Sequence, residues 1–363
     1  MAEHPTPKAG ITAIAPYVGG KSKVEGVSRV IKLSSNENPW GPSPKAVAAF
    51  NAQAASLHRY PDGGHAALRE AIARVEKLPE NELICGAGSD ELLGLTVHAY
   101  AGPGDEVLFT EHGFLMYRIY TQANGATPVT APESNLSADV DALLAAVTPR
   151  TKIVFLANPN NPTGTVIPFS EIRRLRAGLR EDIILGLDAA YAEYLDHADY
   201  EAGHSLVHEG TNTIVFHTFS KIHGLPALRL GYAHAPAHII DILNRVRSPF
   251  NVNSAALAAG IAAIEDTAYV AEMRTRNAGE LARVSDAIRA YGYNVVPSVT
   301  NFILVHVGAK AKALNEHLAA RGLIIREVGN YGLPEFLRIS IGTAEENDLL
   351  LAAVADFAKS HAA

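Results

Sequence analysis

Short, uninterrupted apolar segments alternate with amphipathic segments between about residue 64 and residue 218, and this alternation restricts the possible folds most strongly. The segment 151–157 (TKIVFLA) is the clearest strand, because it is apolar, β-branched and lacks a polar face. Strands of this kind are covered on both faces, as in parallel sheets. Apolar residues at three- and four-residue spacing favour helices between such strands. The pattern therefore predicts an α/β fold with a mostly parallel sheet.

The expected elements fall into two regions. Those of the first region are strands at 105–110, 151–157, 182–188 and 213–218, and helices at 65–77, 90–101, 114–124 and 169–179. After about residue 245, long helices are expected at 254–264, 269–291 and 344–359, with strands at 301–306 and 336–341. We therefore predict an extended N-terminal arm over 1–45, a large domain over 46–245 and a smaller α+β domain over 246–363.

The composition restricts the compartment and the partners. The single cysteine, Cys85, excludes a disulfide framework and favours a reducing compartment. The first ten residues lack the apolar core of a signal peptide, and the apolar run 255–264 is shorter than the roughly 20 residues of a membrane span. The net charge of −7 and the absence of a basic block argue against nucleic acid as a partner, and the 15 histidines form no familiar metal motif. We expect a cytoplasmic protein without a metal site.

Lys221 directly follows the expected strand 213–218, in the segment Thr-Phe-Ser-Lys. Thr218 and Ser220 place hydroxyl groups near it that suit a phosphate, and Arg229 is close enough along the chain to pair with the same phosphate. A lysine at the end of a buried strand can serve as a nucleophile. An ordinary loop lysine would give the same short pattern, so this segment alone leaves both interpretations open.

Asp188 ends the expected strand 182–188, in the segment DAAY. Its carboxylate could cap a helix, or it could pair with a protonated ring nitrogen while Tyr191 donates a hydrogen bond to a ring oxygen. Asn161, in the segment NPNNPTG after 151–157, could bind the same oxygen. Most segments of that composition are plain turns, so these residues too carry two interpretations.

The segment 86–91 (GAGSDE) opens the expected helix 90–101. Backbone N–H groups at the positive end of a helix bind phosphate, although this segment lacks both the third glycine of the dinucleotide motif and the Gly-Lys of a P-loop. Together, the four clusters supply a lysine, a carboxylate, an amide and a phosphate site at strand ends. Pyridoxal phosphate (PLP) chemistry requires this combination of groups.

The same clusters resemble a known family. The segments SSNENPWGPSP, GAGSDELL, NPNNPTG, DAAY and TFSKIHGLPALRLGY are similar to the aspartate-aminotransferase superfamily of fold type I, from about residue 10 to the C-terminus. The segment NENP, the arm residues Ala15-Pro16-Tyr17 and the tail are most similar to its histidinol-phosphate aminotransferase branch, which includes broad-specificity aromatic enzymes. The resemblance implies a PLP-binding large domain, a smaller α+β domain and a homodimer with shared active sites.

The resemblance also assigns roles to the motif residues. It implies that Lys221 binds PLP as an imine and moves protons, while Asp188 pairs with the ring nitrogen. Asn161 and Tyr191 are implied to contact the ring oxygen. The other implied cofactor contacts are Ala87, Gly88, Ser89, Phe114, Thr218, Ser220, Arg229 and, from the second subunit, Tyr60.

Two positions depart from the family pattern. Phe114 stands where many relatives have tyrosine, which keeps a ring for stacking on the cofactor but loses the hydroxyl. Pro226 and Ala227 replace the usual Ala-Gly after the lysine, which leaves the shape of that loop open.

The substrate-binding residues implied by the family are Arg338, Arg326, Tyr17 and Asn38. Arg338, in FLRISIGT, matches the arginine that clamps the substrate carboxylate, and a guanidinium suits a phosphate equally well. Arg326 and Tyr17 are the further donors expected for a phosphate ester, although Arg326 also fits an exposed surface arginine and Tyr17 a packing residue.

The implied reaction converts histidinol phosphate and 2-oxoglutarate into imidazole-acetol phosphate and glutamate. Phenylalanine and tyrosine are alternative substrates. A PLP-dependent decarboxylase of a phosphorylated amino acid could use the same residues, because the bond that breaks depends on its alignment with the ring. A non-catalytic PLP-binding regulator is disfavoured, since the arm is too short for a DNA-binding domain and the chain is acidic.

Overall fold

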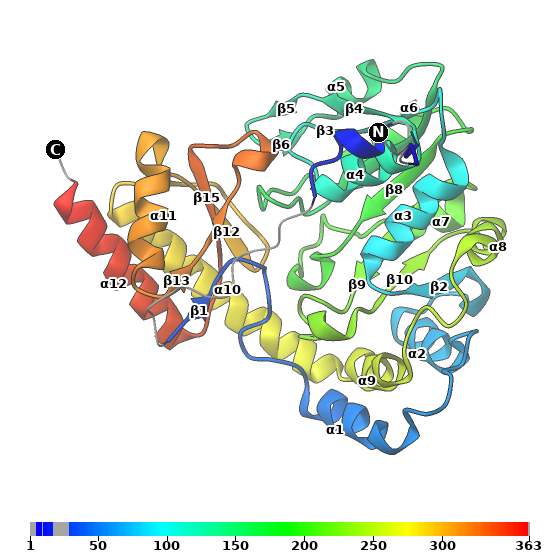
Figure 1. The fold of residues 1–363 in the computed structure, drawn as a ribbon, viewed down its shortest axis with the longest axis horizontal. Coiled ribbons are helices and arrows are strands. Elements are labelled where there is room, and N and C mark those ends of the chain that lie inside the picture. The colour runs from blue at the N-terminus through cyan, green and yellow to red at the C-terminus, as the bar shows by residue number, and fades with distance from the viewer. Residues whose placement is uncertain (1–4, 9, 17–28, 362–363) are drawn as a thin grey trace.

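The computed structural model describes residues 5–8, 10–16 and 29–361. A seven-stranded sheet with the order β2-β10-β9-β8-β7-β3-β4 forms the first region, which lies in the right half of Figure 1. Neighbouring strands run parallel except β10, which is antiparallel to both β2 and β9. The strands are β2 (Leu83–Gly86), β3 (Glu106–Thr110), β4 (Thr127–Ala131), β7 (Thr151–Ala157), β8 (Ile184–Asp188), β9 (Thr213–Thr218) and β10 (Gly231–His234). The expected α/β fold is confirmed.

The packing of β7 explains why the five residues 153–157 are apolar in succession. Ile153 and Phe155 pack into a core on one face of the sheet, whereas Val154 and Leu156 pack into a separate core on the other face. The helices of the first face are α3 (Ser89–Tyr100), α4 (Leu115–Ala123) and α8 (Ala237–Val246), and those of the second are α5 (Val140–Ala145), α6 (Phe169–Gly178) and α7 (His204–Glu209). Because helices cover both faces, six of the seven residues of β7 are buried, and Lys152 near its start is partly exposed.

A second, antiparallel sheet has the order β11-β12-β15-β14. Its strands are β11 (Asn294–Val295), β12 (Phe302–His306), β14 (Arg326–Glu327) and β15 (Phe336–Ser340), and the helices that share its core are α10 (Thr267–Ala290), α11 (Ala311–Ala319) and α12 (Ala344–Ser360). The arm joins this region, because β1 (Ile31–Lys32) pairs in parallel with β13 (Leu323–Ile324). Ile31 and Leu33 are buried in the same core.

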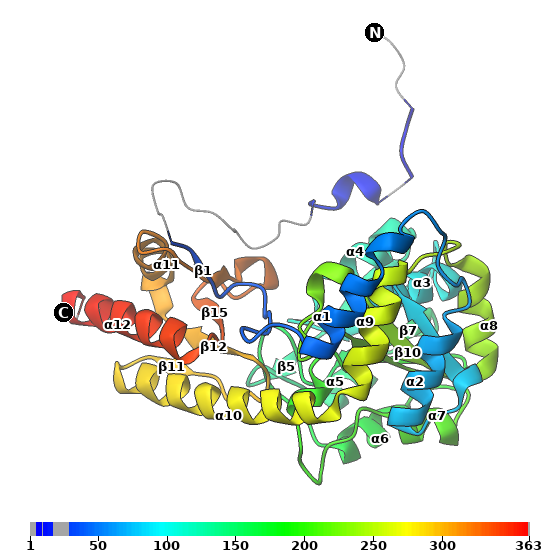
Figure 2. The ribbon, with the colours of Figure 1, turned by 90° about the horizontal axis from the view of Figure 1, so that it is seen from below.

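Helix α9 packs with the first region although it lies beyond residue 246. It shares a buried core with α1 and α2, and Figure 2 shows α1 and α9 side by side. These helices are α1 (Pro44–Ala52), α2 (Ala66–Glu76) and α9 (Ser254–Glu265). The division into two domains stays a prediction. The packing of α9 supports a domain boundary near Asp266, where α9 ends and α10 begins.

The expected helices and strands agree with the structure within two residues at each end. Strands β2, β4 and β10 were not expected, since β2 and β10 are four residues long and β4 contains a proline and two threonines. The remaining short elements are β5 (Glu133–Ser134), β6 (Ser137–Ala138), η1 (Ile11–Ala13), η2 (Ala54–Ser56), η3 (Glu80–Glu82), η4 (Ala192–Tyr194), η5 (Pro226–Leu228), η6 (Gly308–Lys310) and η7 (Gly329–Tyr331). Among the described residues, no helix has the length and apolarity that crossing a bilayer requires.

Candidate active site

A cavity lies where β7, β8 and β9 end, and Lys221 and Asp188 both form part of its wall. Ligands of open α/β sheets bind at the carboxyl ends of parallel strands, so this is the position expected for a site. The predicted residues in its lining are Ser89, Phe114, Asn161, Asp188, Tyr191, Thr218, Ser220, Lys221 and Arg229. The structure thus brings nine predicted residues to one cavity.

Asp188 is the last residue of β8 and is 6% exposed. Its carboxylate accepts a hydrogen bond from the Tyr117 hydroxyl at 2.8 Å and one from the Ala190 backbone N–H at 3.2 Å. Burial raises the pKa of Asp188 to about 6, because little water remains to stabilise the charge, and the two hydrogen bonds offset part of this effect. A cation beside the carboxylate would favour its charged form, which suits the protonated nitrogen of a heterocycle.

Lys221 lies in the loop that follows β9. Its Nζ donates a hydrogen bond to the Ser35 carbonyl at 3.4 Å and lies 5.6 Å from the centre of the Tyr191 ring. The Asn36 side-chain amide donates to the Tyr191 hydroxyl oxygen at 2.8 Å. The arm residues Ser35 and Glu37 line the cavity, and Asn36 between them holds the Tyr191 hydroxyl.

Arg229 joins two segments that were predicted to bind phosphate. Its Nη1 donates to the Ser220 hydroxyl at 3.3 Å and its Nη2 to the Asp90 carboxylate at 3.2 Å. Gly88 has φ of 85°, and a Cβ there would lie 2.6 Å from Arg229 Nη2, so only glycine lets the guanidinium pack against the start of α3. The α3 N-terminus has no side-chain cap, which leaves backbone N–H groups available beside a hydroxyl and a guanidinium.

Arg338 in β15 is 6% exposed and connects the two sheets. Its Nη1 donates to the Asn161 side-chain oxygen at 2.5 Å and its Nη2 to the Ser34 carbonyl at 2.8 Å. The guanidinium carbon lies 5.4 Å from the centre of the Phe302 ring, and within the described residues Nε is buried without a hydrogen-bond partner. A buried guanidinium with an unused donor is suited to an anionic ligand.

Two further predicted residues lie beside the cavity rather than in its lining. The Ala87 backbone N–H donates to the Glu91 carboxylate at 2.6 Å, so an internal partner already satisfies it. The Asn38 side chain is 8% exposed and donates to the Ile222 carbonyl at 2.8 Å, directly after Lys221. In this structure Asn38 therefore holds the lysine loop against the arm.

Besides Gly88 and Arg338, two more predicted residues of the described part of the chain, Arg326 and Tyr60, are not in the lining. Arg326 pairs with Arg338 across β14 and β15, which places both side chains on one face of that sheet. Tyr60 is 82% exposed and stacks on Phe250, with 4.6 Å between the ring centres. Tyr17 lies outside the described residues.

Sequence reasoning missed Tyr117, the hydrogen-bond donor to Asp188. A signal was present, because Tyr117 follows Phe114 by three residues and therefore shares a face of α4 with it. A tyrosine buried in a helix also needs a partner for its hydroxyl. Glu37 was missed as well; it lines the cavity and accepts a hydrogen bond from Lys32 Nζ at 2.7 Å.

Comparison with known proteins identifies the family to which this geometry belongs. The family model described as aminotransferase class I and II matches residues 28–354. The chain belongs to this family. The aminotransferase is also similar to two curated proteins named histidinol-phosphate aminotransferase. The relative from Paramagnetospirillum magneticum is 56% identical and that from Rhodopseudomonas palustris 52% identical, each over 97% of this chain and 98% of the relative.

A solved structure agrees with these sequence relatives. The crystal structure of histidinol-phosphate aminotransferase from Sinorhizobium meliloti, in complex with pyridoxal-5'-phosphate, matches the aminotransferase with a TM-score of 0.87. The two are 30% identical, and the match covers 92% of each chain. The expected fold type, with its large sheet and second smaller sheet, is therefore shown by both sequence and structure.

Proposed function

We propose that this PLP-dependent aminotransferase converts histidinol phosphate and 2-oxoglutarate into imidazole-acetol phosphate and glutamate, a reaction of histidine biosynthesis. The observation that carries the reaction class is the presence of Lys221 and the buried carboxylate of Asp188 in the wall of one cavity. The substrate is supported by the full-length identity to two proteins named histidinol-phosphate aminotransferase.

The chemical groups in and around the cavity fit PLP. A buried carboxylate with a raised pKa suits a cationic ring nitrogen, and Arg229, Ser220 and the start of α3 suit a phosphate. Phe114 lines the same cavity with an aromatic ring, which offers a stacking surface. Asn161 and Tyr191 would contact the ring oxygen.

When bound, PLP supplies an aldehyde that reacts with amino groups and a ring that accepts electrons from the substrate carbon. Lys221 would hold the cofactor covalently until the substrate amine replaces it. The released Nζ would then take the proton from the substrate Cα and return it to the cofactor carbon. Asp188 would keep the ring nitrogen protonated, and the Tyr117 hydroxyl would hold that carboxylate in place.

Substrate recognition is assigned to the arginine side of the cavity. Arg338 would bind the carboxylate of 2-oxoglutarate and glutamate, and its unused Nε supplies a further donor. A phosphate ester occupies the corresponding position in histidinol phosphate, and Arg326, on the same face of the sheet, would add a second positive charge. Tyr17 and Asn38 stay predictions as substrate contacts.

Single-turnover reactions with different amines test the substrate. The PLP-loaded enzyme would be mixed with histidinol phosphate, phenylalanine or tyrosine, and the loss of the cofactor's absorbance band would be followed in time. We expect histidinol phosphate to react fastest. A faster reaction with phenylalanine would replace the proposed substrate by an aromatic amino acid, and release of CO2 without formation of pyridoxamine phosphate would replace the transaminase by a decarboxylase.

A homodimer with shared active sites is also proposed. Tyr60 and Phe250 stack on each other at the surface, and the neighbouring residues Phe50 and Leu57 are also exposed, 42% and 76% respectively. Exposed apolar groups that gather in this way are typical of an interface. Tyr60 would then contact the cofactor phosphate of the partner copy.

Mixed dimers test this arrangement. Lys221→Ala and Tyr60→Ala copies would each be weakly active alone. If Tyr60 serves the partner's site, a dimer of the two variants contains one intact site, and refolding them together should restore activity. No restoration in mixed dimers would place Tyr60 outside the shared site.

A cytoplasmic location stays a prediction.

A further inference from the structure

Three histidines, His217 of β9, His204 of α7 and His234 of β10, form a continuous hydrogen-bonded chain between two glutamates. His217 Nδ1 lies 2.9 Å from Glu193 Oε1, and His217 Nε2 lies 3.2 Å from His204 Nε2. His204 Nδ1 lies 2.9 Å from His234 Nδ1, and His234 Nε2 lies 3.1 Å from Glu82 Oε2. We call these three imidazoles the histidine chain. Both ring nitrogens of each imidazole are used.

The histidine chain has fewer protons than contacts. Each of its four contacts needs one proton, because carboxylates only accept and each contact between two imidazoles requires one N–H donor. Three neutral imidazoles carry one N–H each and supply three protons. One contact is therefore left with two acceptors facing each other, unless a further positive charge is present. Either an extra proton or a metal cation would satisfy the chain.

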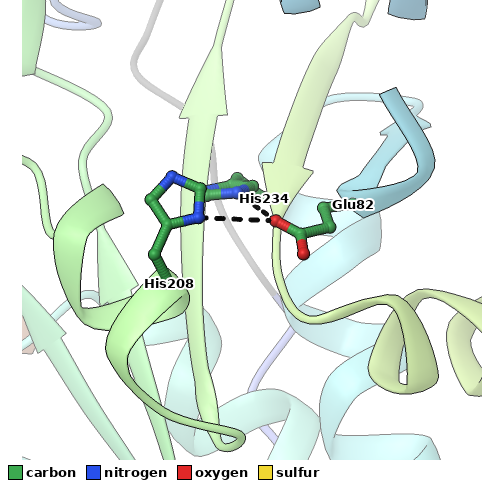
Figure 3. A group of neighbouring side chains, drawn as sticks. All are labelled: Glu82, His208 and His234. Atoms are coloured by element: carbon green, nitrogen blue, oxygen red, sulfur yellow. Dashed lines mark hydrogen bonds and ion pairs between the residues drawn. The ribbon is translucent and has the colours of Figure 1, made fainter. Parts of the chain in front are cut away.

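The outer end of the histidine chain has the features of a cation site. His208 Nδ1 lies 3.7 Å from the same Glu82 oxygen that faces His234, as Figure 3 shows. The side chains of Glu82 and His208 are 23% and 44% exposed, whereas that of His234 is fully buried. An ion could therefore enter from solvent and meet a buried imidazole.

We propose that Glu82, His208 and His234 form a binding site for a divalent transition-metal ion of the zinc type. The three ligand atoms lie within 4.8 Å of one another. Bonds of about 2.0–2.2 Å place tetrahedral zinc ligands roughly 3.3–3.5 Å apart, so the separations of 3.1 and 3.7 Å between the Glu82 oxygen and the two imidazole nitrogens need only small adjustments. Two imidazoles and one carboxylate are a ligand set that zinc accepts, with water in the fourth position.

The inner part of the histidine chain supplies the support that a metal-bound imidazole requires. A metal ligand histidine usually donates its other ring N–H to a fixed acceptor, which orients the ring. Here His234 Nδ1 faces His204, and the order of donors continues through His217 to Glu193. With a cation on His234 Nε2, three N–H groups serve the three remaining contacts, and every atom of the chain has a matching partner.

The ligands come from three separate elements. Glu82 ends η3, His208 lies in α7 and His234 ends β10. His204 and His208 are four residues apart in α7 and share one face of it, and their ring centres lie 5.0 and 5.1 Å from that of His234. A bound ion would link α7 and η3 to β10. The proposed metal site does not depend on the proposed function of the cavity.

Zinc titration of the tag-free, PLP-loaded enzyme after chelator treatment tests the site. We expect one ion per chain, bound with an affinity measured by competition with a chromophoric chelator. Co2+ in its place should show the visible absorption of a tetrahedral ion. His208→Ala should weaken binding at least about 100-fold, because loss of a direct ligand exceeds the loss of a supporting residue. Glu82→Gln should weaken it similarly.

His238→Ala is the matched control, since His238 is exposed on α8 and contributes nothing to the cluster. This variant should bind zinc as the wild type does. His208→Ala is preferred to a change at His234, because its partly exposed side chain can be removed without opening the core. Equal zinc binding by His208→Ala and wild type, or no binding by the wild type, would overturn the proposal. In the latter case, 15N chemical shifts of a doubly protonated His217 would identify the missing charge as a proton.

Discussion

The two sides of the active-site cavity are built in different ways. The side formed by the seven-stranded sheet takes Asp188 from the end of β8 and Lys221 from the loop after the neighbouring strand β9. The pairing of these two strands sets where the segments that carry both residues leave the sheet. The other side is formed by arm residues such as Ser35. Arg338 of β15 holds this side from behind the lining through Ser34 and Asn161, although these segments are far apart in the chain. The first side is positioned by backbone pairing within one sheet, and the second by packing between distant segments.

This difference suggests that the two sides of the cavity have different roles in the reaction. Residues held by one ladder keep a fixed geometry, as groups that bind and use a cofactor require. Residues on the arm and the second sheet can shift together relative to the first sheet, and their contact with it includes the hydrogen bond from Arg338 to Asn161. Changes on the first side should therefore affect catalysis and cofactor binding, and changes on the second should affect substrate affinity.

The largest effect is expected from Lys221→Ala. Turnover should fall by at least about 10⁴-fold, because the variant loses both the covalent anchor and the proton carrier. Steady-state transamination and the absorbance of the lysine-bound cofactor would measure this loss. Lys312→Ala is the control, since Lys312 is 82% exposed. Full turnover by Lys221→Ala would disprove the central assignment on the sheet side.

Asp188→Asn should lower kcat by about 10²–10³-fold, because the ring nitrogen loses its negative partner. The same variant has a test that is independent of activity. Since burial raises the pKa of Asp188 to about 6, the folded cofactor-free chain keeps a proton that the unfolded chain releases near pH 3.9. The free energy of unfolding should therefore fall as the pH rises from about 4 to 6, by about 2–3 kcal/mol.

Urea denaturation of the cofactor-free protein at pH 4.5 and 7.5 would measure this dependence. The wild type should lose stability between the two pH values through Asp188, and Asp188→Asn should lack this contribution. If wild type and Asp188→Asn lost the same stability between the two pH values, the buried carboxylate would not be protonated in the folded chain. The raised pKa would then no longer support Asp188 as the partner of a cation.

Arg338→Lys tests the second side of the cavity. The ammonium group keeps the charge but cannot make the paired hydrogen bonds of a guanidinium. Loss of one hydrogen bond to a charged ligand predicts a rise of about 10–100-fold in KM for the dicarboxylate substrate. PLP affinity and the absorbance of the bound cofactor should stay near wild type. A fall in kcat without a change in KM would contradict the division between the two sides.

Tyr117→Phe should have the smallest effect. It removes the hydroxyl donor to Asp188 but leaves the carboxylate to pair with the cofactor, so we expect a loss of about tenfold in kcat. The pKa of Asp188 in the cofactor-free chain should also rise, because one stabilising hydrogen bond is gone. An NMR titration of the carboxyl group would measure it. An unchanged pKa would show that Tyr117 only fills space.

The sheet side of the cavity could be predicted from sequence because its signals are local. The strands 151–157 and 213–218 have the predicted bounds in the structure, and the chemical groups follow directly after them. Motif spacing therefore placed Asn161, Asp188 and Lys221 at one sheet edge. Their roles stay predictions, but their common position is a property of the structure.

On the second side, the motif FLRISIGT predicted Arg338, but its contacts could not be predicted because they join distant segments. Nothing near Arg338 in the sequence indicates that it reaches Asn161 and Ser34. The hydrogen bond of Tyr117 to Asp188 crosses from a helix to a strand, and the three candidate metal ligands lie on three elements with no regular spacing. Spacing rules detect ligands on one element or one loop, and they miss sites assembled by tertiary packing.

The position of β10 has a consequence for synthesis of the chain. Strand β2 has β10 as its hydrogen-bonded neighbour in the sheet, so it leaves the ribosome long before its partner exists. The same late segment carries Lys221 and Arg229 between β9 and β10. Until β10 is synthesised, β2 has no strand to pair with and its backbone groups are exposed to solvent, which favours chaperone binding or off-pathway pairing. The closing of this sheet edge and the assembly of the lysine loop should therefore be one event in the maturation of the nascent protein.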